Sequence, residues 1–208
     1  ETTRLEFKLE PAKTLGSGGP GLAKTAASGV ELISAGKYEE AIVQFTEVIK
    51  EVPVHAVSYF YRGLAYERSG RNEEALQDYQ KATELKPDFL LPYSRSGVIW
   101  AKKGDFEKAG NFYKKALDAG DLDSTTHYNY GVCLINLEKS DEARAVFEKL
   151  LAHDPDYSDV YYQLGILYLS AGETARAKEL LEAFVARDPE NKNTPLAREI
   201  LKSLKERP

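Results

Sequence analysis

Histidines are the first side chains in this sequence to test for catalysis or metal binding. None of His55, His127 and His153 has a second ligand at metal-site spacing, such as His-x-x-x-His. We expect His127 to replace a core aromatic residue, and His55 and His153 to be solvated. The histidines therefore predict no metal site.

Cysteine and paired carboxylates give no catalytic pattern either. Cys133 is the single cysteine, and a small buried thiol is its simplest interpretation. The acidic pairs at 73–74 and 141–142 begin amphipathic stretches, where carboxylates favour the helix dipole. The glycine-rich run 16–21 is not followed by Gly-Lys-Ser/Thr, so it is not a phosphate loop. We predict that the protein is not an enzyme and has no catalytic residues, metal or cofactor.

Composition excludes further classes of function. The chain has 208 residues, of which 42% are hydrophobic and 29% charged, close to an ordinary folded protein. Its net charge of −5 is the wrong sign for holding nucleic-acid phosphates. No apolar run approaches the roughly 18 residues of a membrane span. We therefore expect no nucleic acid partner and no membrane span.

A repeat of 34 residues organises the chain. Five alanines recur at this spacing, and five glycines keep it twelve positions earlier. An aromatic residue or leucine follows each alanine by four positions, on the same helical face. The three series are Ala41, Ala75, Ala109, Ala143 and Ala177; Gly29, Gly63, Gly97, Gly131 and Gly165; and Phe45, Tyr79, Tyr113, Phe147 and Leu181.

The small residues and the turn residues have a physical reading. Two helices that cross closely need small residues where their backbones meet, and Gly63 and Ala75 supply them from opposite sides. Each 34-residue unit contains two apolar stretches at helical spacing, which predict two helices. In four of the five units a glycine falls where the first of these helices should end, the usual place for a left-handed cap. These glycines are Gly36, Gly70, Gly104 and Gly172, whereas Glu138 takes this position in the fourth unit, where we expect an altered or strained turn.

These residues resemble the tetratricopeptide repeat family. The units are 22–55, 56–89, 90–123, 124–157 and 158–191, so the resemblance covers 22–191. It implies an all-α fold, a right-handed α–α superhelix of five helix-turn-helix repeats. Residues 192–208 are predicted to form a C-terminal capping helix, with Thr194 as its cap and Leu196, Ile200 and Leu204 as its apolar stripe.

The N-terminal residues 1–21 read as a strand-like tail and a glycine-rich linker. Residues 4–10 alternate polar and apolar side chains, which is typical of a half-buried strand. The tail resembles the end of a carboxypeptidase-regulatory-like β-sandwich, which precedes such arrays in some bacterial envelope proteins. A disordered leader is the alternative. The compartment stays open, and the resemblance favours a bacterial extracytoplasmic setting.

The family resemblance also implies a binding surface, because its first helices line a concave groove that holds a protein or peptide partner. The groove residues that we predict are Phe60, Tyr61, Arg68, Arg95, Lys102, Tyr128, Asn129, Asn136, Tyr162 and Gln163. Aromatic and arginine side chains are frequent interface anchors, and amides can bond a peptide backbone. We expect a ligand segment that is apolar with some acidic character.

Two further functions compete with this scaffold hypothesis. The array could self-associate as a homo-oligomer or act as a spacer within a larger protein, or it could bind RNA through helical repeats. RNA-binding repeats of this kind are usually basic, whereas this chain is acidic.

The two-carboxylate clamp of chaperone-binding members is missing, because its asparagine position holds Val30, Leu64, Val98, Val132 and Ile166.

Overall fold

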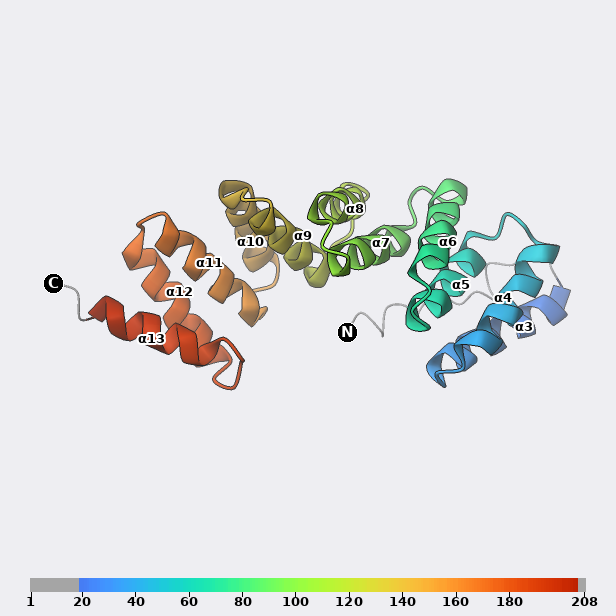
Figure 1. Cartoon of the computed structure of the whole chain (residues 1–208), viewed down its shortest axis with the longest axis horizontal. Coiled ribbons are helices and arrows are strands. Elements are labelled where there is room, and N and C mark those ends of the chain that lie inside the picture. Colours follow the sequence, from blue (N-terminus) through green and yellow to red (C-terminus); the bar gives the residue numbers. More distant parts are fainter. Residues whose placement is uncertain (1–18, 206–208) are drawn as a thin grey trace. The chain divides into compact units, whose positions relative to one another are not determined.

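Helices joined by short turns make up the part of the chain that the structure describes. This computed structural model describes residues 19–205 (Figure 1). Eleven helices and no strand occur in that range. They are α3 (Gly19–Ser34), α4 (Tyr38–Glu51), α5 (Ala56–Arg68), α6 (Asn72–Leu85), α7 (Leu90–Lys102), α8 (Phe106–Asp118), α9 (Ser124–Asn136), α10 (Ser140–His153), α11 (Ser158–Ser170), α12 (Thr174–Arg187) and α13 (Thr194–Lys205).

The chain divides into two compact units, and the boundary falls in the loop between α8 and α9. The N-terminal unit is Glu1–Asp121 and the C-terminal unit is Leu122–Pro208. The N-terminal unit packs three hairpins in series, α3–α4, α5–α6 and α7–α8. The C-terminal unit packs α9–α10 against α11–α12, and α13 lies on α12. Each unit has its own core of apolar side chains.

The five hairpins confirm the predicted five helix-turn-helix repeats. The first begins earlier than expected, because α3 starts at Gly19 and so includes the last residues of the predicted 1–21 linker. The strand predicted in residues 4–10 lies outside the described residues.

The repeating glycines make room for a side chain of the second helix, which is an aromatic ring in the first four repeats and Leu181 in the fifth. A Cβ atom placed on Gly63 would lie 2.8 Å from the Tyr79 ring and 3.2 Å from the Ala75 carbonyl oxygen. On Gly131 it would lie 2.5 Å from the Phe147 ring. The close approach predicted from Gly63 and Ala75 is therefore confirmed. The nearest neighbour is the side chain four residues after the alanine.

The turns inside the hairpins adopt the predicted left-handed conformation. The φ angles of Gly36, Gly70, Gly104 and Gly172 lie between 74° and 84°. Glu138 has a φ of 60° and is the one non-glycine residue with a positive φ in the described range. The strained turn expected in the fourth repeat is therefore confirmed.

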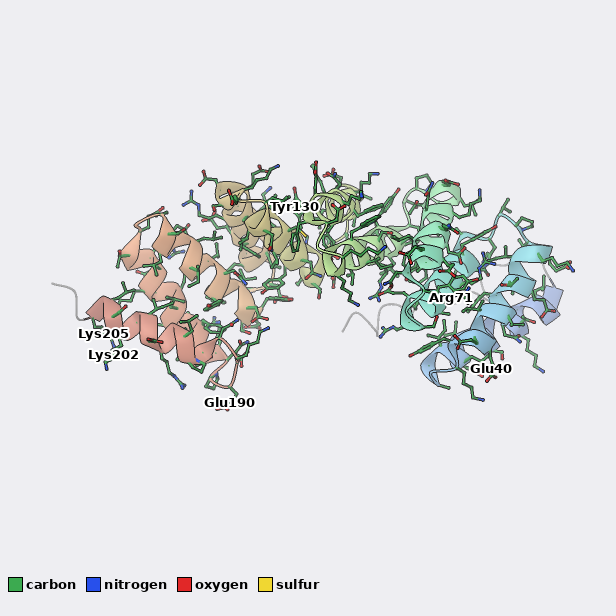
Figure 2. The ribbon with its side chains drawn as sticks, viewed as in Figure 1. Glu40, Arg71, Tyr130, Glu190, Lys202 and Lys205 are labelled. Atoms are coloured by element: carbon green, nitrogen blue, oxygen red, sulfur yellow. The ribbon has the colours of Figure 1, made fainter. Side chains whose placement is uncertain are left out.

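The capping helix α13 is present, but its buried stripe lies one residue later than predicted. Ala197 and Leu201 are its buried apolar residues, with exposures of 0% and 9%, whereas Leu196 is 49% exposed. Lys202 and Lys205 are exposed, and they are labelled on this helix in Figure 2. Thr194 is the first residue of α13, so the residue before the helix is Asn193, and the Thr194 hydroxyl donates to the carbonyl oxygen of Asp188 at 2.7 Å.

Candidate functional site

The histidines are placed partly against expectation. His55 was expected to be solvated but is buried at 6% exposure, with Nδ1 2.7 Å from Ser58 Oγ. Burial lowers the pKa of His55. His127 is only half-buried, and its Nδ1 lies 3.1 Å from the carbonyl oxygen of Asp123, so it is not a full core residue. His153 is exposed as predicted.

Cys133 is a buried thiol, as predicted, with 1% exposure. Burial raises the pKa of Cys133 to about 11, so the sulfur stays protonated at neutral pH. Across residues 19–205, His, Cys, Asp and Glu side chains nowhere form a cluster that could hold a metal ion. No helix of this range is long and apolar enough to cross a bilayer.

Two predicted groove residues of the N-terminal unit lie in its core. Phe60 and Tyr61 are both 0% exposed. The Phe60 ring packs on Phe89 with a centroid distance of 5.2 Å, and the Tyr61 ring stacks on Phe45 at 5.4 Å. A ligand cannot reach these rings in this conformation, so we leave both residues out of the candidate surface.

Arg95 belongs to a buried hydrogen-bond network and does not face an open groove. Its Nε and Nη2 atoms donate to both carboxylate oxygens of Glu67 at 3.0 and 2.5 Å. The Tyr79 hydroxyl donates to the same carboxylate at 2.8 Å. Burial, followed by the nearby Glu67 charge, raises the pKa of Tyr79 above its usual value. This network joins α5, α6 and α7, so Arg95 has a structural role that the sequence did not reveal.

Three predicted groove residues are exposed at the ends of first helices. Arg68 ends α5, Lys102 ends α7 and Asn136 ends α9. The Asn136 side-chain amide donates to the Val132 carbonyl oxygen at 2.8 Å, one turn earlier in its own helix. These side chains are accessible but lie in different repeats.

Four predicted residues of the C-terminal unit lie on α9 and α11, and one hydrogen bond joins two of them. Tyr128, Asn129, Tyr162 and Gln163 are all half-buried, and we call this group the α9–α11 surface. Gln163 Nε2 donates to the Tyr128 hydroxyl at 3.1 Å, which links the two repeats. The Tyr128 ring also packs on Tyr157 and Phe147, at centroid distances of 5.3 and 5.8 Å. Tyr157 and Phe147 therefore hold the Tyr128 ring in position, while part of the Tyr128 side chain remains accessible.

Sequence reasoning missed two members of the same neighbourhood. Tyr157 packs on Tyr128, and Asn191 donates from Nδ2 to Asp159 Oδ1 at 3.0 Å. Both residues occupy the last position of their 34-residue unit, where the repeat pattern prescribes no residue type. The one sequence feature that could have identified them is that both occupy the last position of a unit, next to the first helix of the following segment.

Comparison with known families shows the same repeat. Two models of the tetratricopeptide repeat match the chain, one at residues 27–88 and 101–158 and the other at 138–202. No protein with a curated description matches it.

Solved structures with this fold share little sequence identity with the chain. YrrB, described as a tetratricopeptide protein with an unusual peptide-binding site, is 20% identical with a TM-score of 0.72, covering 84% of this chain and 90% of its own. MamA from Desulfovibrio magneticus RS-1 is 17% identical with a TM-score of 0.72, covering 84% and 98%. Pseudomonas aeruginosa PilF is 17% identical with a TM-score of 0.71, covering 88% of each chain.

At these identities the structures establish the fold alone. The family models match more than half of the chain, and their matches fall on the helical hairpins described above. This chain therefore belongs to the tetratricopeptide repeat family.

Proposed function

We propose that this protein is an interaction scaffold that holds an extended segment of a partner protein on its α9–α11 surface. One observation carries the proposal: Gln163 donates to the Tyr128 hydroxyl and so joins two first helices, α9 and α11, on which Asn129 and Tyr162 are the half-buried neighbours of these residues in the sequence. An extended peptide offers alternating N–H donors and carbonyl acceptors. Asn129 and Gln163 can bond both kinds of group.

The tyrosine rings supply contact area at little entropic cost. Tyr128 is held by Tyr157 and Gln163, and Tyr162 by Phe184 at a centroid distance of 5.3 Å. A side chain that is already fixed loses little freedom when a partner binds. Aromatic residues of this kind often contribute most of the binding energy at an interface. The likeness to YrrB, described as having a peptide-binding site, supports the same function.

The test replaces the two amides. Peptides are selected from a random display library with the full chain, and their dissociation constants are measured by calorimetry. We expect Asn129→Ala combined with Gln163→Ala to weaken binding about thirtyfold, because each lost hydrogen bond contributes roughly 1 kcal/mol. Asn111→Ala removes an exposed amide from α8, a second helix, and should leave the affinity unchanged.

Two outcomes would contradict the proposal. Unchanged affinity in the double variant, with helicity intact by circular dichroism, would place the peptide elsewhere. A failure to select any peptide, together with a mass that rises with concentration in light scattering, would favour the self-association alternative.

A further inference from the structure

A pocket in the N-terminal unit lies between the first helix α7 and the second helices α6 and α8. It has a volume of about 600 Å³ and is bordered by α6, α7 and α8, which pack in series (Figure 1). Its lining includes four aromatic residues, of which Tyr79 is fully buried, together with Thr83, Lys108 and Lys115. The other three aromatic residues are Tyr93, Trp100 and Phe112. Its size lies within the usual range of ligand sites, which is about 300–1,000 Å³.

The pocket is hollow because this repeat carries a serine where the second and fifth repeats carry a large residue, although the first repeat also has a serine, Ser28, at this position. Ser96 is the seventh residue of its unit, and its hydroxyl donates to the Pro92 carbonyl oxygen of the same helix at 2.7 Å. The equivalent residue of the second unit is Arg62, which fills the space through a bidentate pair with Asp78 at 2.7 Å. In the fifth unit it is Leu164, and the equivalent pocket there measures only about 290 Å³.

The wall of the large pocket formed by α6 also carries a smaller residue than the equivalent wall of the small pocket. Thr83 borders the large pocket at the position that Leu151 occupies in the small one. The small pocket is also bridged by a hydrogen bond from the Tyr168 hydroxyl to Glu148, and Trp100 replaces this tyrosine in the large pocket. The space around Trp100 is thus about twice the equivalent space in the fifth repeat.

The indole N–H of Trp100 is a hydrogen-bond donor that the described part of the protein does not use. Within residues 19–205, the indole N–H of Trp100 donates to no acceptor. The ring lies 4.1 Å from Lys108 Nζ. Lys108 also pairs with Asp105 at 2.9 Å, but the side-chain exposures are 55% and 33%, so solvent screens this pair and it holds the lysine only weakly. An acceptor group beside the ring would satisfy the indole donor and approach this lysine.

The local charge is opposite to that of the whole chain. The lining of the pocket carries Lys108 and Lys115 against Glu84, whereas the net charge of the chain is −5. Lys115 lies 5.5 Å from the Phe112 ring and has no carboxylate partner among the described residues. Glu84, the acidic residue on the other wall, is bonded to Gln80 and Lys81. The rim of the pocket therefore favours an anionic partner.

We propose that this pocket is a second docking site, which takes an aromatic side chain flanked by carboxylates from an acidic segment of a partner protein. The aromatic side chain packs among Tyr93, Trp100 and Phe112, where edge-to-face contacts add to apolar burial. The flanking carboxylates pair with Lys108 and Lys115. A backbone or carboxylate oxygen accepts from the indole N–H. The site is independent of the α9–α11 surface.

Trp100 is the sole tryptophan of the chain, so its fluorescence reports directly on this pocket. The full chain is titrated at low ionic strength with a capped pentapeptide that has phenylalanine at its centre and two glutamates on each side. We expect a saturable change in Trp100 fluorescence with a dissociation constant below about 1 mM. Replacing the central phenylalanine by glycine, or the glutamates by lysines, should weaken binding at least tenfold.

Variants of the protein test the geometry. Lys108→Ala combined with Lys115→Ala should weaken binding at least tenfold, and so should Thr83→Leu, which copies Leu151 and fills the pocket. Arg176→Ala changes the residue equivalent to Lys108 in the small pocket and should leave the titration unchanged. Circular dichroism checks that every variant keeps its helicity, and Asn129→Ala with Gln163→Ala should also leave this titration unchanged.

The proposal would be overturned by any of three results. The first is the absence of a saturable change. The second is equal binding of the glycine-centred peptide, which would show general charge attraction without use of the pocket. The third is tighter binding of a short oligothymidylate, which would make the lysines and rings a site for single-stranded nucleic acid.

Discussion

A single backbone dihedral angle decides how each first helix ends. Glycine adopts the left-handed conformation without a Cβ clash, and Gly70 and Gly172 use it at φ angles of 84° and 79°. Glu138 adopts the same conformation at 60°. The turn hydrogen bonds are the same: Lys139 N donates to Leu134 O at 2.9 Å, as Arg71 N donates to Tyr66 O at 2.8 Å. The surrounding hairpin therefore imposes the conformation on a glutamate.

Replacing Glu138 by glycine should stabilise the C-terminal unit. A left-handed residue with a Cβ atom is disfavoured by roughly 1–2 kcal/mol, and the extra freedom of glycine in the unfolded chain removes part of that gain. We expect the free energy of unfolding, measured in urea, to rise by about 0.5–1 kcal/mol. Gly172→Ala is the matched reverse change and should lower it by about 1 kcal/mol. No gain from Glu138→Gly together with no loss from Gly172→Ala would show that these turns carry no backbone strain.

Burial of individual side chains was the least predictable property at this scale. Phe60 and Tyr61 occupy positions that the repeat pattern assigns to the groove, yet both are fully buried. Large rings at those positions fold down onto Phe45, Tyr79 and Phe89, because these neighbours offer apolar contact. Which neighbours are close enough depends on the packing of adjacent hairpins, and a periodicity in one chain does not contain that information.

At the scale of elements, α13 shows the limits of an apolar stripe read from sequence. Leu196, Ile200 and Leu204 share a helical face, and so do Ala197 and Leu201. The structure buries the second face, with Ile200 packed at its margin. The choice between them depends on how closely α12 approaches, since alanine at 197 permits a shorter distance than leucine at 196.

A matched pair of leucine substitutions tests this orientation. Leu201→Ala should lower the free energy of unfolding of the C-terminal unit by about 2–3 kcal/mol, because it leaves a cavity against α12. Leu196→Ala removes a side chain that is 49% exposed and should change it by less than about 0.5 kcal/mol. Urea unfolding followed by circular dichroism measures both. The reverse order of effects would restore the stripe predicted from the sequence.

At the scale of the whole molecule, the chain holds two cores instead of one continuous one. The buried apolar residues from Ala26 to Ile99 form one cluster and those from Leu134 to Leu201 form another. In repeat proteins, stability comes mainly from each repeat and its nearest neighbours. Each unit is a continuous stretch of chain, so each contains the neighbours that its own core requires.

We therefore predict that a fragment of residues 122–208 folds alone. Its far-ultraviolet circular dichroism should be helical, with a cooperative thermal transition. The shorter fragment 122–191 lacks α13, which buries Ala197 and Leu201 on the core, and its midpoint should fall by at least about 10 °C. An unfolded 122–208 fragment, or equal midpoints for the two fragments, would contradict the separate core or the capping role of α13.

The sequence by itself determined the repeat, the helix pairs, the left-handed turns and the capping helix. Local chemistry dictates these features, because glycine at one turn or alanine at one crossing acts on residues a few positions away. Only the tertiary structure decided that Arg95 is held by Glu67 and that Ser96 leaves a hollow beside Trp100. Both depend on side chains from three helices meeting in space, and residues that a repeat pattern leaves free to vary make those contacts.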